Sequence, residues 1–373
     1  MEIKQWKNVL HIVSGKNQKD VVNPAGKYPI YGSGGLMGYA DDYLCEAGTT
    51  VVGRKGTINR PIFVNEPFWN IDTAFGIVPD IGLNQRYLYY FCVYFNFTPL
   101  DKSTGRPSLS KSDLLKIEMP VPSLPEQERI VSRIEEMFSQ LDDGVETLKK
   151  TKAQLAVYRD AVLKDAFEGD YPQKQLKEIS DTISGYAFKS SKYSPDGEYI
   201  VVKIGNVKER RFDFSRDLTR TTEADASILN KYLLRRGDCL ITLTGSRGKR
   251  DYGFVAMIED QNNYLLNQRV AALRFDTSVA LPEFFQYYLA SHTYRNQFFS
   301  YETGNVGQGN VGIKALTDPF VVVPDMETQK RIVEEIDARL SVCDSIEKTV
   351  NDALQQAEAM RQSILKDAFE GRL

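Results

Sequence analysis

The 373-residue sequence predicts an α+β fold in which two related globular domains are separated by two long helices that form an antiparallel coiled coil. Three observations predict it: a gapless internal repeat, an apolar line with heptad spacing in both copies, and a shared order of motifs in the segments between the copies. The chain is longer than the about 100–200 residues of a typical domain, so two or more domains are expected. Its composition, with 42% hydrophobic and 26% charged residues, is that of a globular protein.

The repeat aligns residues 121–169 with residues 323–371 at an offset of 202, and 19 of the 49 aligned residues are identical. Each copy ends in the sequence LKDAFEG. Neither copy has a proline after its first turn, and both are rich in Glu, Lys, Gln, Ala and Leu, which favours helices. A helix of about 44 residues is about 65 Å long, more than a compact domain needs, so its apolar face needs a partner.

Residues 1–121 are expected to form the first domain. Short β-rich runs follow one another, and one of them, residues 49–53, leads into the basic, glycine-containing loop at residues 54–56. Residues 83–95 are dense in aromatic side chains, so they are expected to form a core helix. A second glycine-containing loop, residues 103–107, follows that helix.

Residues 122–170 are expected to form the first long helix. Its apolar line repeats every seven residues and is flanked by Ile130, Phe138, Val145 and Tyr158, as in a coiled coil. Gly144 is the one expected weak point of this helix. The line consists of Ile134, Leu141, Leu148, Leu155 and Val162.

Residues 171–323 are expected to form the second domain, because they repeat the order of the first. Residues 174–177 and 182–185 resemble residues 4–7 and 12–15. The β-rich run at residues 238–243 then leads into the basic, glycine-containing segment 244–250. An aromatic stretch, residues 282–299, is expected to be helical, and a glycine-rich loop at residues 303–310 follows it.

Residues 324–373 are expected to form the second long helix. The proline that opens the first helix is missing here, so the sequence does not fix where this helix begins. Since a whole domain separates one helix from the next, an antiparallel pairing of the two is the simplest arrangement. The apolar line consists of Ile336, Cys343, Val350, Ala357 and Ile364, and its flanking residues are Ile332, Leu340, Ile346, Leu354 and Met360.

The cysteines and histidines provide little for catalysis or metal binding. The four cysteines, Cys45, Cys92, Cys239 and Cys343, are isolated from one another, which argues against a zinc site or a disulfide framework. The sequence contains two histidines and neither a phosphate-binding P-loop nor an HExxH motif. We therefore expect no catalytic residue and no metal site. The most apolar run, residues 87–97, is too short to cross a bilayer, so a cytoplasmic protein is expected.

The formal net charge of −3 hides an uneven distribution of charge. Residues 1–125 and 171–325 each carry a net charge of +2, whereas residues 126–170 carry −4 and residues 326–373 carry −3. Acidic helices would repel DNA phosphates, so they are either contact faces for protein partners or simply solvated faces of a coiled coil.

The order of domain, long helix, domain, long helix resembles the specificity subunit of type I restriction-modification systems over essentially the whole chain. The residues that carry the resemblance are the helix openings PSLPEQERIV at 122–131 and QKRIV at 329–333, together with both LKDAFEG endings. The resemblance implies two target-recognition domains that each read one half of a split double-stranded DNA sequence, with the helices acting as a ruler.

The resemblance also implies partners and their cofactors. Two methyltransferase (modification) subunits would supply S-adenosylmethionine and the transfer of a methyl group to adenine. Restriction subunits would use ATP and Mg²⁺. This chain would bind no cofactor and would not itself be an enzyme, although the assembled complex would be a DNA methyltransferase and endonuclease.

Basic, hydroxyl and amide side chains gather in the glycine-containing loops of both domains, where they suit contacts with phosphates and base edges. The resemblance places the DNA-reading residues in the same loops. The candidates in the first domain are Ser33, Arg54, Lys55, Arg60, Thr104 and Arg106. Those in the second domain are Thr244, Ser246, Arg247, Lys249, Arg250, Asn305, Gln308 and Asn310. A further cluster, Lys208, Arg210, Arg211, Arg216 and Arg220, either contacts phosphates or is merely exposed.

Two other classes of function are considered. A duplicated coiled-coil scaffold that binds protein partners instead of DNA would show the same repeat. A degenerate methyltransferase is disfavoured, because residues 23–26 (NPAG) lack the Asn-Pro-Pro-aromatic ending that adenine methyltransferases use. The sequence does not indicate which bases are read.

Overall fold

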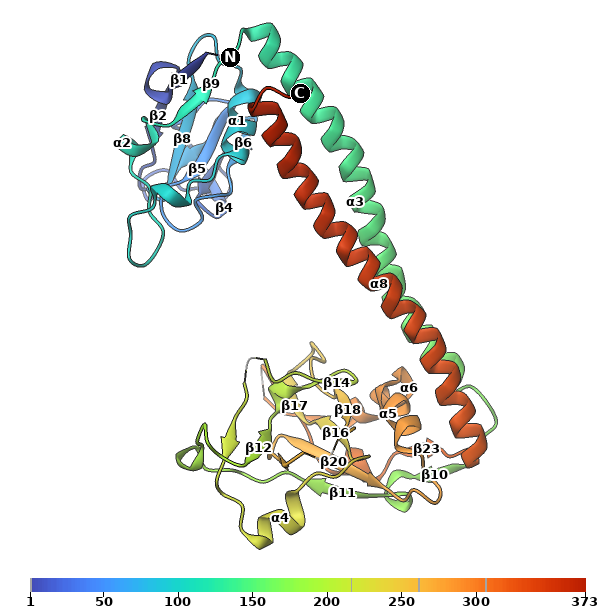
Figure 1. The fold of residues 1–373 in the computed structure, drawn as a ribbon. Helices are drawn as coiled ribbons and strands as arrows, with labels where there is room; N and C mark the ends of the chain where they lie inside the picture. The colour runs from blue at the N-terminus through green and yellow to red at the C-terminus, as the bar shows by residue number, and fades with distance from the viewer. Residues whose placement is uncertain (1, 216, 261, 306) are drawn as a thin grey trace. The chain divides into compact units, whose positions relative to one another are not determined.

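The computed structural model describes residues 2–215, 217–260, 262–305 and 307–373, and it divides into two compact units (Figure 1). Unit 1 comprises Met1–Lys150 and Val350–Leu373, and unit 2 comprises Thr151–Thr349. Each unit contains globular structure and a part of each long helix. We call the residues before the first long helix the first domain, and those between the two long helices the second domain.

The first domain consists of two small sheets and one strand pair. The four-stranded sheet is antiparallel, in the order β2-β8-β5-β6, and the three-stranded sheet has the order β4-β3-β7, with β3 and β7 parallel. Helix α1 (Gln85–Tyr94) packs against β5, β6 and β8, and the short helix α2 spans Lys111–Leu114. The strands are β1 Ile3–Gln5, β2 Leu10–Ser14, β3 Tyr28–Gly32, β4 Gly35–Ala40, β5 Thr49–Gly53, β6 Ile62–Val64, β7 Trp69–Asn70, β8 Ala74–Pro79 and β9 Glu118–Pro120, which pairs with β1.

The second domain repeats this topology, which confirms the expected relation between the two domains. Its four-stranded sheet has the order β11-β20-β16-β18, and its three-stranded sheet, β15-β12-β19, again contains one parallel pair. The strands that the first domain also has are β10 Gln173–Gln175, β11 Ser180–Ser184, β12 Tyr199–Val202, β15 Arg220–Thr221, β16 Cys239–Thr242, β18 Val255–Met257, β19 Tyr264–Leu266, β20 Val270–Phe275 and β23 Phe320–Val322. The remaining strands are β13 Val207–Lys208, β14 Arg211–Phe212, β17 Thr244–Ser246, β21 Glu302–Thr303 and β22 Gln308–Val311.

The aromatic stretch of the second domain forms two helices instead of the single one expected. Helix α5 (Pro282–Ala290) ends at Ser291, and α6 (His292–Ser300) begins directly after it. The Ser291 hydroxyl donates to the carbonyl oxygen of Tyr288 and accepts from the backbone N–H of Tyr294, so one side chain ends the first helix and caps the second. The other helices are α4 (Ala226–Tyr232) and α7 (Lys314–Thr317).

A repeated Ser-Gly pair marks a close approach of two backbones in each domain. A Cβ atom on Gly15 would lie 1.8 Å from the carbonyl oxygen of Ile71, and one on Gly185 would lie 1.9 Å from that of Asn267. Only glycine fits at either position. This steric need accounts for the matching motifs at residues 12–15 and 182–185.

The long helices are α3 (Leu124–Ala166) and α8 (Met326–Phe369). Asp325 fixes the start of α8, where the proline is missing. Its carboxylate accepts from the backbone N–H groups of Glu327 and Thr328, so an aspartate N-cap marks the start of α8 without a proline.

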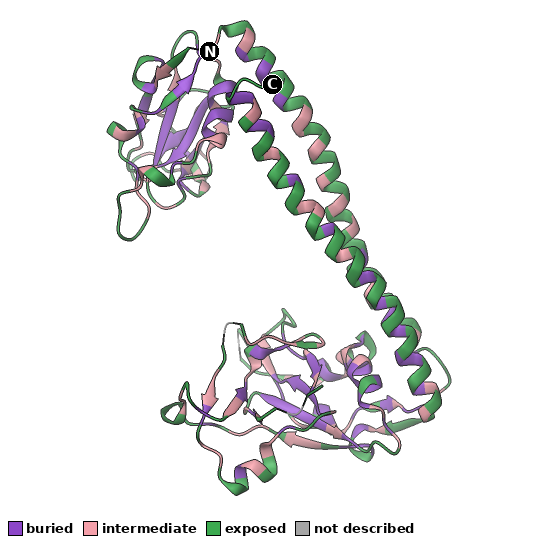
Figure 2. Cartoon of the chain, viewed as in Figure 1, coloured by how far each residue is buried: buried purple, intermediate pink, exposed green. Residues whose placement is uncertain are grey.

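Within each unit, the start of one long helix packs beside the end of the other, which confirms the antiparallel pairing. In unit 1, Ile130 and Ile134 share a hydrophobic core with Ile364 and Phe369. In unit 2, Val162 and Leu163 share a core with residues 332–340 of α8. Figure 2 shows buried residues along both long helices and in the sheets.

The predicted apolar line is mostly buried, but some flanking residues are not. Leu141 and Leu148 are half-buried, whereas the expected flanking residues Tyr158, Ile346 and Met360 are exposed. At these places the helices meet through Arg159 and Arg361, which follow Tyr158 and Met360 and lie four places beyond Leu155 and Ala357 of the line. The buried members of the line are Ile134, Leu155, Val162, Ile336, Cys343, Val350, Ala357 and Ile364.

Two equivalent arginines occupy these inward positions. In unit 2, Arg159 forms ion pairs with Asp344 and Glu347, and in unit 1, Arg361 forms one with Asp142. Arg159 and Arg361 are related by the offset of 202, and so are Asp142 and Asp344. The same ion pair therefore links the helices in both units.

A buried glutamine attaches the start of each long helix to its domain. The Gln127 side chain accepts from the backbone N–H of Asn84 at 2.7 Å and donates to the carbonyl oxygens of Gly82 and Pro122. Gln329, at the equivalent position, accepts from the N–H of Leu281 at 2.8 Å and donates to the carbonyl oxygens of Val279 and Pro324. Neither glutamine is accessible to solvent.

A phenylalanine attaches the end of each long helix to a domain. Phe369 packs against Tyr87, Phe91 and Tyr94 of α1 in unit 1. Phe167 packs against Phe284 and Tyr288 of α5 in unit 2. These two phenylalanines belong to the two LKDAFEG sequences, so the repeated ending forms the same joint twice.

We expect Gly144→Ala to raise the free energy of unfolding by about 1 kcal/mol, because alanine loses less backbone entropy in a helix interior. Gly144 is exposed within α3, and a Cβ there would meet no atom within 4 Å. Urea denaturation followed by circular dichroism measures the change. Gly15→Ala is the matched control and is expected to destabilise the protein through its clash with Ile71.

Candidate nucleic-acid interface

The candidate residues of the first domain lie on loops at one edge of its sheets. Ser33 follows β3, and Arg54 and Lys55 follow β5. Backbone hydrogen bonds hold the loop that carries Thr104 and Arg106 against the loop after β5. The N–H of Gly56 donates to the carbonyl oxygen of Pro107, and the N–H of Leu109 donates to that of Arg54, both at 2.8 Å. Four of the six candidates are thus brought onto two adjoining loops.

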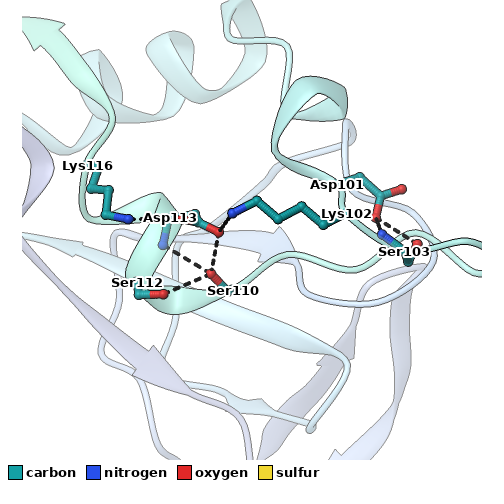
Figure 3. A network of polar contacts seen from close by, with 7 residues as sticks. All are labelled: Asp101, Lys102, Ser103, Ser110, Ser112, Asp113 and Lys116. Atoms are coloured by element: carbon teal, nitrogen blue, oxygen red, sulfur yellow. Dashed lines mark hydrogen bonds and ion pairs between the residues drawn. The ribbon is translucent and has the colours of Figure 1, made fainter.

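The base of the loop that carries Arg106 is fixed by two carboxylates (Figure 3). Asp101 accepts from the N–H and the hydroxyl of Ser103 and from the N–H of Ser108, and these hydrogen bonds lower its pKa. Lys102 donates to Asp113 at 2.8 Å, which holds the pKa of that carboxyl well below its usual range. The loop therefore has a fixed base, while Thr104 and Arg106 at its tip are exposed.

Two hollows lie beside these loops. One, of about 480 Å³, is lined by Arg54, Lys102, Lys111 and the carboxylate of Asp113, together with several serines. The other, of about 450 Å³, is lined by Ser33 and Arg106 among others. Positively charged side chains at both hollows favour an anionic partner.

Two candidates of the first domain differ from the rest. Ser33 is only 8% exposed, so its side chain presents little surface to a partner. Arg60 is exposed, but its neighbour Asn59 is bonded to Asn96 and Thr98 beyond the end of α1. Among the described residues, no hydrogen bond or ion pair joins Arg60 to the other candidates.

In the second domain, strand pairing brings four candidates together. Strand β17 pairs antiparallel with β22, which places Thr244 opposite Asn310 and Ser246 opposite Gln308. Arg247 follows β17, and its guanidinium donates to the carbonyl oxygen of Gly304 at 2.7 Å. Asn305, next to Gly304, is exposed on the turn between β21 and β22.

The tip of the loop after β17 is held by its own contacts. Asp251 accepts from the N–H of Ser246 at 2.6 Å, a bond that lowers the pKa of Asp251. Arg250 has a positive φ of 50°, and its guanidinium lies 5.0 Å from the centre of the Phe299 ring and donates to Asn296. Lys249 is exposed beside it. Arg250 is therefore partly committed to packing, whereas Lys249 is free to reach outward.

Arg295, which was not among the residues predicted from the sequence, supports this loop. Its guanidinium donates to the carbonyl oxygens of Gly253, Arg250 and Tyr252, at 2.7–3.2 Å, and lies over the ring of Phe299. Burial lowers the pKa of Arg295. Since Arg295 lies within an aromatic stretch that reads as core, no sequence signal marked it.

The offset of 202 relates the two candidate sites. The N–H of Leu109 donates to the carbonyl oxygen of Arg54. The N–H of Val311, which is 202 residues further along, donates in the same way to the carbonyl oxygen of Leu243. Arg106 consequently corresponds to Gln308. Ser108, which faces Lys55 across a bridge, corresponds to Asn310. The offset of 202 found in the long helices also holds for the residues just before them. Applied there, it would have added Ser108 to the candidates, because Ser108 corresponds to the candidate Asn310.

Three members of the further basic cluster lie on one hairpin, where Lys208 of β13 pairs with Arg211 of β14 and Arg210 lies in the turn between them. Arg210 stacks over Tyr287, Arg220 donates to the carbonyl oxygen of Gly197, and Lys208 lines a separate hollow. Arg211 is exposed, and Arg216 lies outside the described residues.

The groups at both loop clusters can form hydrogen bonds and ion pairs, but they offer no activated nucleophile. The four cysteines are buried, and burial raises the pKa of the Cys45 thiol to about 12. Among the described residues, no three His, Cys, Asp or Glu side chains are grouped to hold a metal ion. In the same part of the chain, no helix is both long and apolar enough to cross a membrane.

Comparison with known proteins gives consistent matches over the whole chain. The family profile of the type I restriction modification DNA specificity domain matches residues 1–156 and again residues 168–356. The EcoBI specificity subunit of Escherichia coli is 23% identical over 354 residues, which cover 87% of this chain and 73% of that protein. The MjaVIII specificity subunit of Methanocaldococcus jannaschii is 25% identical, with 88% and 76% covered.

Two solved structures share the fold. A chain from a type I restriction-modification system, determined to explain its assembly and conformational transition, superposes with a TM-score of 0.78 at 16% identity, covering 100% of this chain and 98% of the other. The HsdS subunit from Thermoanaerobacter tengcongensis gives a TM-score of 0.54 at 16% identity, with 100% and 97% covered.

Proposed function

The chain belongs to the type I restriction modification DNA specificity family, and from this premise we propose that it is the non-catalytic subunit that reads a bipartite DNA target and recruits methyltransferase and restriction subunits. The observation that carries the proposal is the pair of related loop clusters, one in each domain, that present guanidinium, amide and hydroxyl groups. The target-recognition domains comprise residues 1–121 and 171–323, and the helical regions comprise residues 122–170 and 324–373.

Each loop cluster reads one half of the target. Phosphate contacts position a protein on the duplex, and contacts with base edges give specificity. The Gln308 and Asn310 amides on β22 suit adenine edges, and the Arg106 and Arg247 guanidinium groups suit guanine edges. Because the two clusters differ in their side chains, they read different half-sites.

The chemistry of the complex comes from its partners. S-adenosylmethionine and adenine methylation belong to two modification subunits, and ATP and Mg²⁺ belong to the restriction subunits. In unit 2, Val157, Tyr158, Val342 and Ile346 of the long helices are exposed, which supports a protein partner on the helices.

We expect Arg247→Ala to weaken binding at the second domain's half-site by about 1–3 kcal/mol and to leave the first half-site's preference unchanged. Arg236→Ala is the matched control, because Arg236 is an exposed arginine of the same domain that precedes the start of β16, whereas the candidate loop follows β17. The measurement is a gel shift on duplexes selected from a random pool, with each half-site varied in turn. Equal losses at both half-sites would contradict independent reading.

The salt dependence of binding separates this proposal from a protein scaffold. A DNA reader that neutralises several phosphates loses affinity steeply as salt rises, because bound counterions are released. The full-length chain is titrated with random duplex DNA at several salt concentrations. A scaffold with no DNA site would show no such binding, and that result would contradict the proposal.

A further inference from the structure

The first domain exposes two large apolar side chains beside its basic loops. Leu36 and Met37, on β4, are 54% and 58% exposed. Tyr31 of β3 pairs with Leu36, and the preceding Ile30 pairs with Gly38, so Met37 is the extra residue of a β-bulge. A bulge of this kind redirects a side chain that regular pairing would place elsewhere.

The bulge directs Met37 toward the 450 Å³ hollow. The Met37 sulfur lies only 2.7 Å from where a Cβ on Gly32 would be, so the absence of a side chain at Gly32 makes room for it. Leu36, Met37 and Ile71 form the apolar part of the lining. The polar part includes the hydroxyls of Ser33, Thr57 and Thr73 and the Arg106 guanidinium.

The Arg106 guanidinium lies beside Gly56: one of its nitrogens is 2.9 Å from where a Cβ atom on Gly56 would be. The lining residues of the hollow include no carboxylate, and Lys55 is exposed on the adjoining loop. An anionic partner with a small apolar group therefore fits this surface better than an apolar peptide does. In the major groove of unmodified DNA, the 5-methyl group of thymine is the only methyl group that a base edge presents.

We propose that this hollow reads a thymine methyl group in the half-site of the first domain, with Met37 and Leu36 contacting the methyl and Arg106 contacting a neighbouring base or phosphate. The proposal rests on the proposed function.

Deoxyuracil tests the proposal directly, because it differs from thymine only by the missing methyl. The full-length chain is bound to a duplex selected from a random pool, and each thymine of the first half-site is replaced in turn. At one of them, we expect about a fourfold loss of affinity, the factor that corresponds to burying one methyl group. Met37→Ala should lose affinity for the thymine duplex by a similar factor and should no longer distinguish thymine from deoxyuracil there.

Ile81→Ala is the matched control, since Ile81 is a fully exposed apolar residue of the same domain outside the hollow. It should keep both the affinity and the discrimination. Thermal unfolding of each variant checks that the fold is intact.

Three results would overturn the inference: a selected first half-site without thymine, no effect of deoxyuracil on the unaltered chain, or unchanged discrimination by Met37→Ala. Increased fluorescence of 2-aminopurine placed beside the thymine would also overturn it, because that signal reports base unstacking by a wedge. If the chain selects no DNA sequence at all, the proposed function itself fails, which is a distinct result.

Discussion

Gln329→Leu is expected to lower the free energy of unfolding of unit 2 by about 3–5 kcal/mol, because it leaves one buried and two partly buried backbone groups without partners. The affected groups are the N–H of Leu281 and the carbonyl oxygens of Val279 and Pro324. Leucine is similar in size to glutamine, so the loss reports the missing hydrogen bonds and not a cavity. Urea denaturation followed by circular dichroism measures it.

The chain offers a matched control for this substitution. Gln140 lies exposed on α3, and Gln140→Leu should change the stability by less than about 0.5 kcal/mol. Gln127→Leu should have the large effect on unit 1 instead. A loss below about 1 kcal/mol for Gln329→Leu would show that water or the backbone satisfies these groups when the glutamine is absent.

A fragment of residues 1–171 is expected to form an antiparallel dimer. Alone, it would expose the apolar line of α3 and the surface that Phe369 covers in unit 1. A second copy would supply Val162, Leu163, Ala166 and Phe167 where the full chain uses Ile364, Leu365, Ala368 and Phe369, which are the equivalent residues at the offset of 202. Two identical readers related by a two-fold axis must prefer an interrupted palindrome.

The helix-linking ion pair provides a charge-swap test of this dimer. At the same register, Arg159 of one copy meets Asp142 of the other, as Arg159 meets Asp344 in the full chain. Arg159→Asp should weaken the fragment dimer by about 2 kcal/mol over its two symmetric sites, or about 30-fold, through like-charge repulsion. Adding Asp142→Arg should restore it.

Light scattering measures the fragment's mass, and selection from random duplexes identifies its site. A folded monomer, or a dimer that selects a non-palindromic site, would contradict the antiparallel two-fold arrangement. Failure of the second substitution to rescue the first would place the two helices in another register.

The sequence was most informative about the long helices, because heptad spacing and repetition depend on side chains close together in the chain. It predicted the antiparallel pairing and the buried line, but it placed Tyr158, Ile346 and Met360 at the helix contact. Heptad spacing alone does not decide whether the third or the fourth residue after each line position turns inward. The inward arginines, Arg159 and Arg361, decide it through partners on the other helix.

The loop clusters were predicted in outline only. Glycine and basic residues marked the loops, but the pairing of β17 with β22 and the support from Arg295 depend on residues 42 to 66 positions apart. Such contacts leave no local pattern in one sequence. Whether the candidate side chains contact DNA stays a prediction.

The glutamine joints have a consequence for how such a protein can change. Apart from the carbonyl oxygens of Pro122 and Pro324, just before their own helices, the side chains of Gln127 and Gln329 bond to backbone atoms of the loops before α1 and α5. Every amino acid except proline, which lacks an N–H, offers the same backbone groups. The joint therefore sets almost no requirement on the identity of the residues it holds. Within this one chain, the two domains have drifted far apart in sequence while remaining docked in the same way. A new DNA preference can thus evolve by accumulating substitutions in a domain, or by exchanging it for another, without any compensating change in the helices that carry it.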